Sequence, residues 1–495
     1  MKKPILELKN IQKSFGGVKA LKNVNLTIYP GEIHCLAGEN GCGKSTLIKI
    51  ISGAYQKTSG EIYIDGQKEE ELTPIKSIEK GIQVIYQDFA VFPNLTVAEN
   101  IAMNKILMGK KKVINWKEAE KTAEEGMKQI GAQMAPEAVV GTLPVADKQM
   151  VAICRAIVND AKILILDEPT TALTTKEISL LYKILRRLRG NGMAIILVNH
   201  KLNEIYEIAD RLTILRNGEN VANGTLDEFT NERFVMCMTG RELKNTVYHP
   251  KTGGENILTV SGLSSTGAFE DISFEMSKGD ILGITGLLGS GRSEIGEALF
   301  GLRRIDRGSV ILKGKEISIR SVQDAVRSKI AYVPEDRLTE GLFLDCSICE
   351  NTVAASLKKY KNNHRIDRKG MLASTADWIK RLGCVASSPE AAIRTLSGGN
   401  AQKIVISKWL NTNPDLLILN GPTVGVDIGA KADIHAILHD LADSGVGIII
   451  ISDDLQEILQ NCSKILVIQK GRAAGLTDSA ELDEQKLQKK LGGSK

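Results

Sequence analysis

The sequence repeats itself once, and this duplication limits the possible fold more than any other feature. Residues 38–46 read GENGCGKST, and residues 286–294, half the chain later, carry the altered copy GLLGSGRSE. The segment ILILDEPT at 163–170 returns as LLILNGPT at 416–423, in the same order along the chain. A chain of 495 residues is also too long for a single hydrophobic core. We therefore predict two homologous domains.

The boundary between the two domains is predicted where turn-forming residues interrupt the pattern. A proline and two adjacent glycines lie within residues 249–254, and such residues end helices and strands. The join is therefore expected between Arg241 and Asn256. This predicts a first domain at 1–241, a linker at 242–255 and a second domain at 256–495.

Short apolar runs alternate with helical stretches in both halves. These runs occur at 33–37, 163–166 and 195–198, and their copies at 281–285, 416–419 and 448–451. Strands that are apolar on both faces are typical of a parallel sheet covered by helices. Amphipathic segments such as 45–52, ended by Gly53, predict the covering helices. The prediction is an α/β fold with its functional groups at the ends of the strands.

Residues 38–46 have the sequence context of a phosphate-binding loop, because Gly-x-x-x-x-Gly-Lys-Ser follows a predicted strand and precedes an apolar helix. Glycines let backbone N–H groups surround a phosphate, and the helix dipole favours its charge. Lys44 is predicted to reach the β- and γ-phosphates, and Ser45 to bind Mg²⁺. A glycine-rich turn without a ligand is the alternative. The nucleotide-binding residues predicted in this loop are Gly38, Asn40, Gly41, Gly43, Lys44, Ser45 and Thr46.

Two adjacent carboxylates follow the apolar run at 163–166. Asp167 is predicted to hold Mg²⁺, directly or through water, and Glu168 to accept a proton from the attacking water. Carboxylates at a strand end can also be solvated loop residues. The apolar strand before them and the phosphate loop upstream favour the catalytic interpretation.

Residues 396–400, LSGGN, resemble the signature motif of ABC-transporter ATPases. Residues 332–337, YVPEDR, and Arg292 in place of the loop lysine also resemble the C-terminal half of bacterial sugar-importer ATPases. The resemblance covers nearly the whole chain, and the chain is similar to the fused ATPase subunits of ribose-, galactose- and arabinose-type uptake systems. It implies two tandem ABC-type P-loop NTPase domains. Each would have a RecA-like parallel-sheet core, a helical subdomain and an antiparallel β subdomain.

The same resemblance implies roles for three further side chains. Gln87 corresponds to the glutamine that contacts Mg²⁺ and the attacking water, and His200 to the switch histidine at the γ-phosphate. Phe15 corresponds to the aromatic residue that stacks on adenine. The alternatives are a core position for Phe15 and a helix-capping role for His200.

The family packs two such domains head to tail, so that each ATP contacts the P-loop of one half and the signature of the other. Site one would combine the first P-loop, Gln87, Asp167, Glu168 and His200 with the second half's signature. That signature would contribute Ser397, Gly398, Gly399 and Asn400. ATP and Mg²⁺ are the implied ligands, and no essential residue is missing from this set.

Site two is predicted to be degenerate. Arg292 replaces the loop lysine, and Asn420 and Gly421 replace the metal-binding aspartate and the catalytic glutamate. Asp453 occupies the position of the switch histidine, and residues 144–147, PVAD, replace the signature SGGN. The residues assigned to this site are Gly286, Gly289, Gly291, Arg292, Ser293, Glu335, Asn420, Gly421 and Asp453. We predict ATP hydrolysis at site one only, with nucleotide either held or absent at site two.

Composition narrows the partners and the location. A net charge of +5 without a long basic block gives no indication of nucleic-acid binding. The longest apolar runs are far shorter than the roughly 20 residues of a membrane-spanning helix. The resemblance therefore implies a peripheral subunit at the cytoplasmic face of the membrane, docked on two permease subunits and served by an extracytoplasmic solute-binding protein. The alternatives are a tandem ATPase acting on nucleic acid or ribosomes, and a non-hydrolysing regulatory scaffold.

The eight cysteines are scattered, as expected for reduced thiols. Cys346 and Cys349 have redox or metal spacing but no second pair nearby, so we interpret them as ordinary thiols. Cys42 lies within the P-loop. Its position near a helix N-terminus predicts a lowered thiol pKa and sensitivity to thiol reagents.

Overall fold

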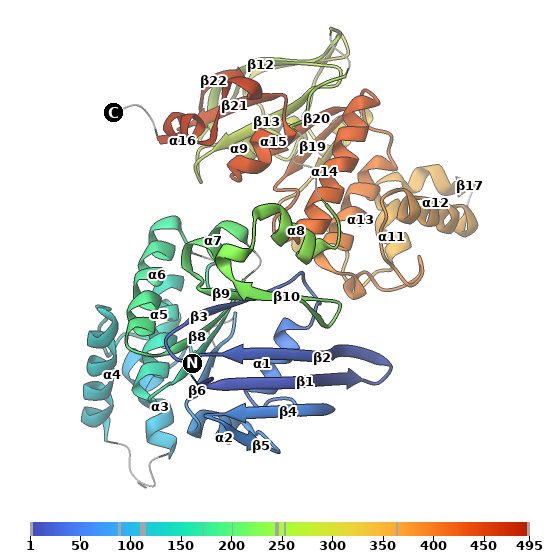
Figure 1. Cartoon of the computed structure of the whole chain (residues 1–495). Helices are drawn as coiled ribbons and strands as arrows, with labels where there is room; N and C mark the ends of the chain where they lie inside the picture. The colour runs from blue at the N-terminus through green and yellow to red at the C-terminus, as the bar shows by residue number, and fades with distance from the viewer. Residues whose placement is uncertain are drawn as a thin grey trace. The chain divides into compact units, whose positions relative to one another are not determined.

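The computed structural model describes residues 3–87, 91–108, 115–171, 173–199, 201–242, 247–251, 254–362 and 365–492. The chain divides into two compact units, Met1–Leu243 and Lys244–Lys495, called unit 1 and unit 2 below (Figure 1). None of the helices in these ranges combines the length and the apolar character needed to span a membrane.

A sheet with a parallel core forms the centre of unit 1. Its strands are β3 (Ile33–Ala37), β6 (Ile82–Ile85), β7 (Ile163–Asp167), β8 (Ala194–Val198), β9 (Arg211–Arg216) and β10 (Glu219–Thr225). They lie in the order β10-β9-β3-β8-β7-β6, and every neighbouring pair is parallel except β9 with β10. The predicted α/β fold with buried parallel strands is thus confirmed.

A separate antiparallel sheet covers one face of this core. Its strands are β1 (Leu6–Phe15), β2 (Val18–Ile28), β4 (Ser59–Ile64) and β5 (Gln67–Glu69), in the order β2-β1-β4-β5. The helices of unit 1 are α1 (Lys44–Ile51), α2 (Pro74–Glu79), α3 (Val97–Met108), α4 (Trp116–Ile130), α5 (Val145–Val158), α6 (Thr175–Gly190), α7 (Leu202–Ile208) and α8 (Asn231–Thr239).

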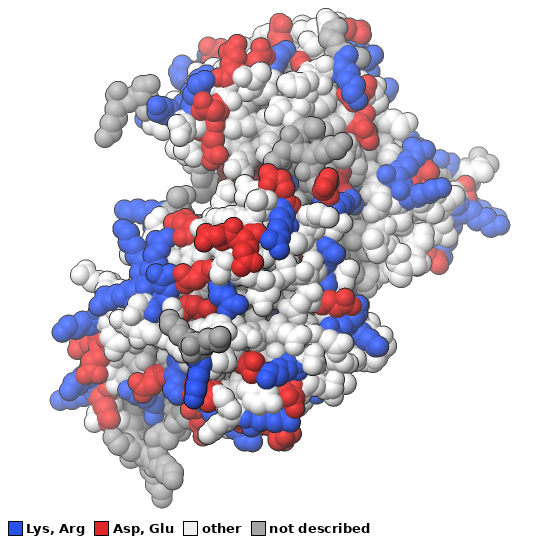
Figure 2. Space-filling model, viewed as in Figure 1, with Lys and Arg blue, Asp and Glu red and all other residues white. Residues whose placement is uncertain are grey.

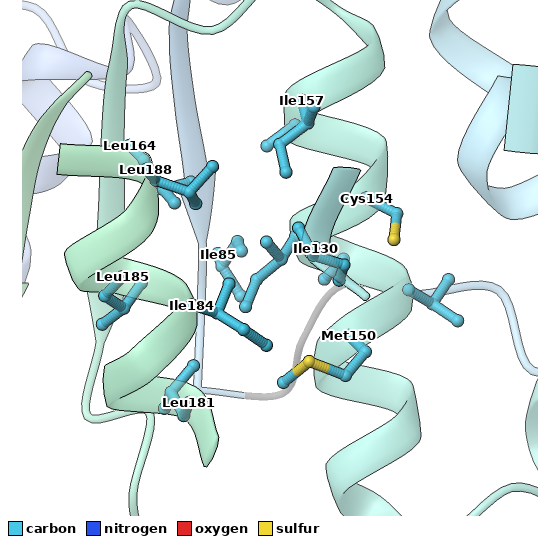
Figure 3. Close-up of a cluster of buried hydrophobic side chains, with 14 of the residues drawn as sticks. Ile85, Ile130, Met150, Cys154, Ile157, Leu164, Leu181, Ile184, Leu185 and Leu188 are labelled. Atoms are coloured by element: carbon cyan, nitrogen blue, oxygen red, sulfur yellow. The ribbon is translucent and has the colours of Figure 1, made fainter. Parts of the chain in front are cut away.

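Alternate residues of β7 enter two different hydrophobic clusters, which explains why the strand is apolar on both faces. Ile163 and Ile165 pack with α1 and the antiparallel sheet. Leu164 and Leu166 pack on the other face with the helices α3 to α6. Figure 3 shows part of this second cluster, with side chains of α5 and α6 facing the strands. The burial of both faces fixes the position of the strand ends that carry polar residues.

Unit 2 repeats the architecture of unit 1. Its central sheet has the order β16-β19-β20-β13-β21-β22, which matches unit 1 strand for strand when β6 is aligned with β16. These strands are β13 (Ile281–Gly286), β16 (Ile330–Val333), β19 (Leu416–Asn420), β20 (Gly447–Ile451), β21 (Lys464–Gln469) and β22 (Arg472–Asp478). Its antiparallel sheet contains β11 (Asn256–Ser265), β12 (Phe269–Ser277), β14 (Arg307–Leu312) and β15 (Lys315–Ile317).

The helices of unit 2 follow the same plan. They are α9 (Arg292–Leu299), α10 (Val322–Arg327), α11 (Ile348–Val353), α12 (Arg368–Arg381), α13 (Gly398–Leu410), α14 (Ile428–Asp443), α15 (Leu455–Asn461) and α16 (Glu484–Gly492). Unit 2 also contains a short hairpin of β17 (Lys361–Asn362) and β18 (Arg365–Ile366), whereas most of the corresponding segment of unit 1, 109–114, lies outside the described residues. Both halves of the repeat therefore fold alike.

Charged side chains of both signs are interspersed on the face drawn in Figure 2. Opposite charges meet in surface pairs such as Lys68 with Glu61 at 2.7 Å and Arg472 with Glu270 at 2.6 Å. Exposed pairs of this kind contribute little to stability.

Candidate functional site

The first P-loop connects β3 to α1 and takes a conformation that only glycine tolerates well. Gly38, Gly41 and Gly43 have φ values of +154°, +81° and +108°. A Cβ atom on Gly38 would lie 2.4 Å from both the Sγ of Cys42 and the carbonyl oxygen of Leu215. The glycines predicted from the motif are therefore required by backbone conformation and packing.

Lys44 begins α1 and is buried beneath the loop. Its Nζ donates to the carbonyl oxygens of Gly38 at 2.6 Å and Glu39 at 2.9 Å. Ser45 and Asn40, next to it in the loop region, are exposed. The loop thus holds its cation at the point where backbone N–H groups and the helix N-terminus can receive an anion.

The acidic pair and Gln87 belong to the same edge of the sheet as the P-loop. Asp167 ends β7, and Gln87 is exposed two residues after β6. Because β3, β6, β7 and β8 are parallel, their carboxyl ends meet at one edge. The structure therefore places the P-loop, the acidic pair and Gln87 on one edge. His200, the predicted switch residue, lies outside the described residues.

Asp167 and Glu168 have unusual environments. Burial, and then the neighbouring charge of Glu168, raises the pKa of the Asp167 carboxyl, and Lys44 opposes that shift. Glu168 has φ +47°, in the left-handed region that disfavours side chains other than glycine. Its backbone N–H donates to the carbonyl oxygen of Val198 at 3.1 Å, which ties the end of β7 to β8.

The chemistry of these side chains fits a hard divalent cation in unit 1. Ser45, Gln87 and Asp167 offer a hydroxyl, an amide oxygen and a carboxylate, the donor types that Mg²⁺ accepts. A cation bound beside Asp167 would oppose the effect of burial and of Glu168, which together raise the pKa of this carboxyl. Among the described residues no group of three or more His, Cys, Asp or Glu side chains could hold a metal alone. Mg²⁺ would therefore take its remaining ligands from water and phosphate.

Phe15 ends β1 and is 44% exposed, which excludes the alternative that it is a core residue. Its ring contacts that of Tyr55 edge to face, with centroids 5.3 Å apart, and the Nζ of Lys13 lies 5.0 Å from its centroid. Tyr55 was not predicted as part of this feature. Residue types gave no signal for it, because Tyr55 and Phe15 are far apart in the sequence.

In the second P-loop, between β13 and α9, the charged side chain of Arg292 has its hydrogen-bond acceptor and its counterion within unit 2. Gly289 and Gly291 keep positive φ values of +75° and +95°. The Nη1 of Arg292 donates to the carbonyl oxygen of Gly286 at 2.5 Å, and its Nη2 lies 3.2 Å from an oxygen of Asp453. Asp453 thus provides the guanidinium with a counterion from the protein.

The polar residues at the next strand end in unit 2 are neutral and hydrogen-bonded to each other. Ser293 Oγ donates to Asn420 Oδ1 at 3.4 Å, and Asn420 Nδ2 donates to the hydroxyl of Tyr332 at 3.4 Å. Gly421, with φ +57°, occupies the position that Glu168 has in unit 1, and Glu335 is exposed after β16. The Asn420 amide carries no charge and is already hydrogen-bonded to Ser293 and Tyr332, so it does not fit Mg²⁺ as the carboxylate of unit 1 does.

The signature of unit 2 forms the start of α13. Ser397 caps this helix, since its Oγ accepts from the backbone N–H of Asn400 at 3.5 Å and from its Nδ2 at 2.9 Å. A Cβ on Gly399 would lie 2.4 Å from the Cβ of Ala430, so this position admits only glycine. The matching helix α5 of unit 1 begins after Pro144, which provides no side-chain cap.

The prediction for Cys42 is wrong. Its side chain is buried, and burial raises the pKa of the thiol, although the nearby charge of Lys44 opposes the shift. The helix N-terminus does not compensate for the loss of solvent around the sulfur. Cys42 is therefore a packed thiol and not an activated one.

One residue that sequence reasoning missed is Glu204, on α7. It accepts hydrogen bonds from Thr170, three residues after Asp167, and from Asn199, at the end of β8. A signal for it did exist, because Glu204 and Glu457 occupy matching positions in the two halves. Glu204 lies on the helix after β8, and Glu457 lies on the helix after β20. Aligning the two halves beyond the known motifs would have found it.

The chain resembles known proteins in both of its halves. A family model described as ABC transporter matches residues 21–171 and 269–424. The chain is 41% identical over 506 residues to the xylose import ATP-binding protein XylG of Geobacillus kaustophilus, with 100% of each chain covered. It is 40% identical over 490 residues to the ribose import ATP-binding protein RbsA of Clostridium perfringens, with 98% of each chain covered. A solved ATP-binding cassette of an ABC transporter, in its ADP conformation, is 25% identical with a TM-score of 0.43, covering 46% of this chain and 93% of that one.

Proposed function

Because this chain belongs to the ABC transporter family of ATP-binding proteins, we propose that it hydrolyses ATP to energise the import of a sugar or sugar-like solute. Relatives that match it over their whole length are named as import ATP-binding proteins for ribose and xylose. The single observation that carries the proposal is the complete set of P-loop and acidic residues at one sheet edge of unit 1.

Each residue assigned to site one has a distinct task. Lys44 and the loop amides bind the phosphates, and Phe15 stacks on the base. Ser45, Gln87 and Asp167 would hold Mg²⁺, which neutralises phosphate charge and orients the transferred group when bound. Glu168 accepts the proton of the attacking water, and His200 contacts the γ-phosphate.

The working site is composite in this proposal. Ser397, Gly398, Gly399 and Asn400 would complete site one from unit 2. Their capped helix start supports this, because a helix N-terminus beside glycines presents backbone N–H groups and a favourable dipole to phosphate. Unit 1 supplies no such cap at the start of α5. We assign the domains as 1–241 and 256–495, with residues 242–255 as the linker.

Site two contributes no hydrolysis. Its metal-binding position is an amide engaged with Ser293 and Tyr332, and the position of the base is Gly421. One ATP would therefore be hydrolysed in each cycle. The alternative function, a tandem ATPase acting on nucleic acid or ribosomes, is not favoured, since the full-length relatives named above are import proteins.

The partners follow from the proposed transport. The subunit would dock at the cytoplasmic face of the membrane on two integral permease subunits, with an extracytoplasmic solute-binding protein delivering the solute. The ATPase residues recognise only ATP and Mg²⁺. Solute specificity would therefore reside in the permease and the binding protein.

The test compares matched substitutions in the two halves. Glu168→Gln should lower the ATPase rate of the purified chain by about 10²–10⁴-fold, since it removes the general base. Arg292→Ala should leave turnover measurable, because site two supplies no chemistry. Near-normal turnover after Glu168→Gln, or complete loss after Arg292→Ala in a folded protein, would contradict the proposal. In the source organism, Glu168→Gln should also abolish uptake of the transported sugar, with labelled ribose and xylose as the first probes.

A further inference from the structure

A carboxylate links two strand ends behind site one. Glu204 lies on α7, and its Oε2 accepts hydrogen bonds from Thr170 Oγ1 at 2.5 Å and Asn199 Nδ2 at 2.7 Å. The hydroxyl of Tyr182 donates to the same oxygen at 3.3 Å. Thr170, Asn199 and Tyr182 are buried. We call Thr170, Asn199 and Glu204 the carboxylate link.

The link joins the two segments that carry the proposed chemistry. Thr170 follows Glu168 by two residues, in the turn after β7. Asn199 follows β8 and directly precedes His200 in the sequence. Hydrogen bonds to an ionised acceptor are short and directional, so they fix the groups that make them. A shift of the carboxylate would therefore move the turn of Glu168 and the segment before His200 together.

Unit 2 contains the same connection without the chemistry. Glu457, on α15, accepts from Thr423 Oγ1 at 2.7 Å and from Ser452 Oγ at 2.6 Å. His435 takes the place of Tyr182, with its Nε2 2.8 Å from Glu457. Both halves therefore place a carboxylate at this point, buried in unit 2 and partly buried in unit 1, but only unit 1 has a catalytic glutamate next to it.

We propose that Glu204 is a positioning residue for ATP hydrolysis, which holds the general base and the switch-histidine segment in one fixed arrangement. This inference rests on the proposed function of site one. Glu204 touches neither substrate nor metal in this role and acts through Thr170 and Asn199. The equivalent Glu457 stabilises unit 2 but does not affect turnover.

Matched isosteric substitutions test the inference. Thr170→Val and Thr423→Val each remove one hydroxyl from the corresponding carboxylate and keep the side-chain shape. Thr170→Val should lower kcat for ATP by about 10- to 100-fold, because small displacements of reacting groups are costly. Its KM for ATP should stay within twofold. Thr170→Val and Thr423→Val should lower the melting temperature by similar amounts. Thr423→Val should nevertheless leave kcat within twofold of the original.

A second pair of variants separates position from charge. In Glu204→Gln the amide oxygen can still accept hydrogen bonds from Thr170 and Asn199. The negative charge that faces the Nζ of Lys201, 3.0 Å from Oε1 of Glu204, is lost. This variant should keep kcat within about fivefold of the original, whereas Glu204→Ala should lose at least as much as Thr170→Val.

Three outcomes would overturn the inference. These are full kcat in Thr170→Val, an equal loss of kcat in Thr423→Val, and a rise of KM in Thr170→Val with kcat unchanged. The Glu168→Gln variant, measured beside them, identifies a different failure. If it hydrolyses ATP normally, the proposed function of site one is wrong, whatever the link variants show.

Discussion

In unit 1 the P-loop cation Lys44 donates hydrogen bonds to two loop carbonyl groups. In unit 2 the guanidinium of Arg292 donates to one loop carbonyl group and forms an ion pair with Asp453. At the next strand end, unit 1 has Asp167, a carboxyl whose pKa is raised by burial and by Glu168. Unit 2 has a neutral amide there, hydrogen-bonded to Ser293. The strands and glycines are shared, so the difference lies in charge. A P-loop scaffold can thus persist while the charges around it change.

The backbone of the two strand ends differs less than their side chains. Glu168 and Gly421 have φ values of +47° and +57°, and both backbone N–H groups donate to the last residue of the neighbouring strand. A left-handed conformation costs a residue with a Cβ atom about 1–2 kcal/mol. Unit 1 therefore keeps a strained glutamate, and unit 2 has relaxed that strain with glycine.

The largest effect expected from this comparison is in metal binding. Titration of Mn²⁺ with a non-hydrolysable ATP analogue, followed by electron paramagnetic resonance, should find one bound ion per chain. Asp167→Asn, which gives unit 1 the residue of unit 2, should weaken that site by at least about 100-fold, since loss of even an outer ligand partner costs 10- to 100-fold.

Lys44→Ala is the control for where that ion binds, because it should remove nucleotide and metal together from unit 1. A second ion in the original chain would contradict the comparison. An ion that still binds in Lys44→Ala but is lost in Arg292→Ala would also contradict the comparison. No bound ion at all would instead contradict the proposed function.

The next effect concerns acid stability in unit 2. Burial alone would raise the pKa of Glu457, but the hydrogen bond from His435 and the charge of Lys431 bring that pKa down to about 2. Because the folded pKa is depressed, the stabilisation is present above the unfolded pKa of 4.5 and is lost as the pH falls toward 2. A shift of this size corresponds to about 3 kcal/mol.

Glu457→Gln should remove this pH dependence between pH 4.5 and 2. Urea unfolding followed by tryptophan fluorescence measures it, since Trp378 and Trp409 both belong to unit 2. Glu484→Gln, on the surface of α16, is the control that should leave the pH profile unchanged. An unaltered profile in Glu457→Gln would show that Glu457 is not ionised in the folded chain.

The smallest effects concern the two left-handed positions. Gly421→Ala should lower the free energy of unfolding of unit 2 by about 1–2 kcal/mol, because φ is +57° and the new Cβ would lie 2.9 Å from Val424. In unit 1, Glu168→Gly should be about 1 kcal/mol more stable than Glu168→Ala, although both are inactive. Differential scanning calorimetry measures both changes, and equal stability of the two Glu168 variants would refute the strain.

The sequence predicted the features that depend on local residue types. The strand around Ile163 and the loop around Gly38 were predicted correctly, because a strand buried on both faces and a glycine-rich turn leave local patterns. The contacts of Glu204 were not predicted, because a glutamate on a helix usually faces solvent and its partners come from other elements. The prediction of a lowered thiol pKa for Cys42 was wrong for a related reason, since the burial of this side chain depends on how closely the loop packs.

The left-handed turn after β19 has a consequence for the evolution of duplicated enzymes. Replacing a strained glutamate by glycine relaxes the backbone, so a copy that makes this change gains stability while it loses a carboxylate. The reverse change at Gly421 would have to restore the strain and find room beside Val424 and Glu335 before any activity returned. A replacement of glutamate by glycine at this turn is therefore easier to make than to reverse.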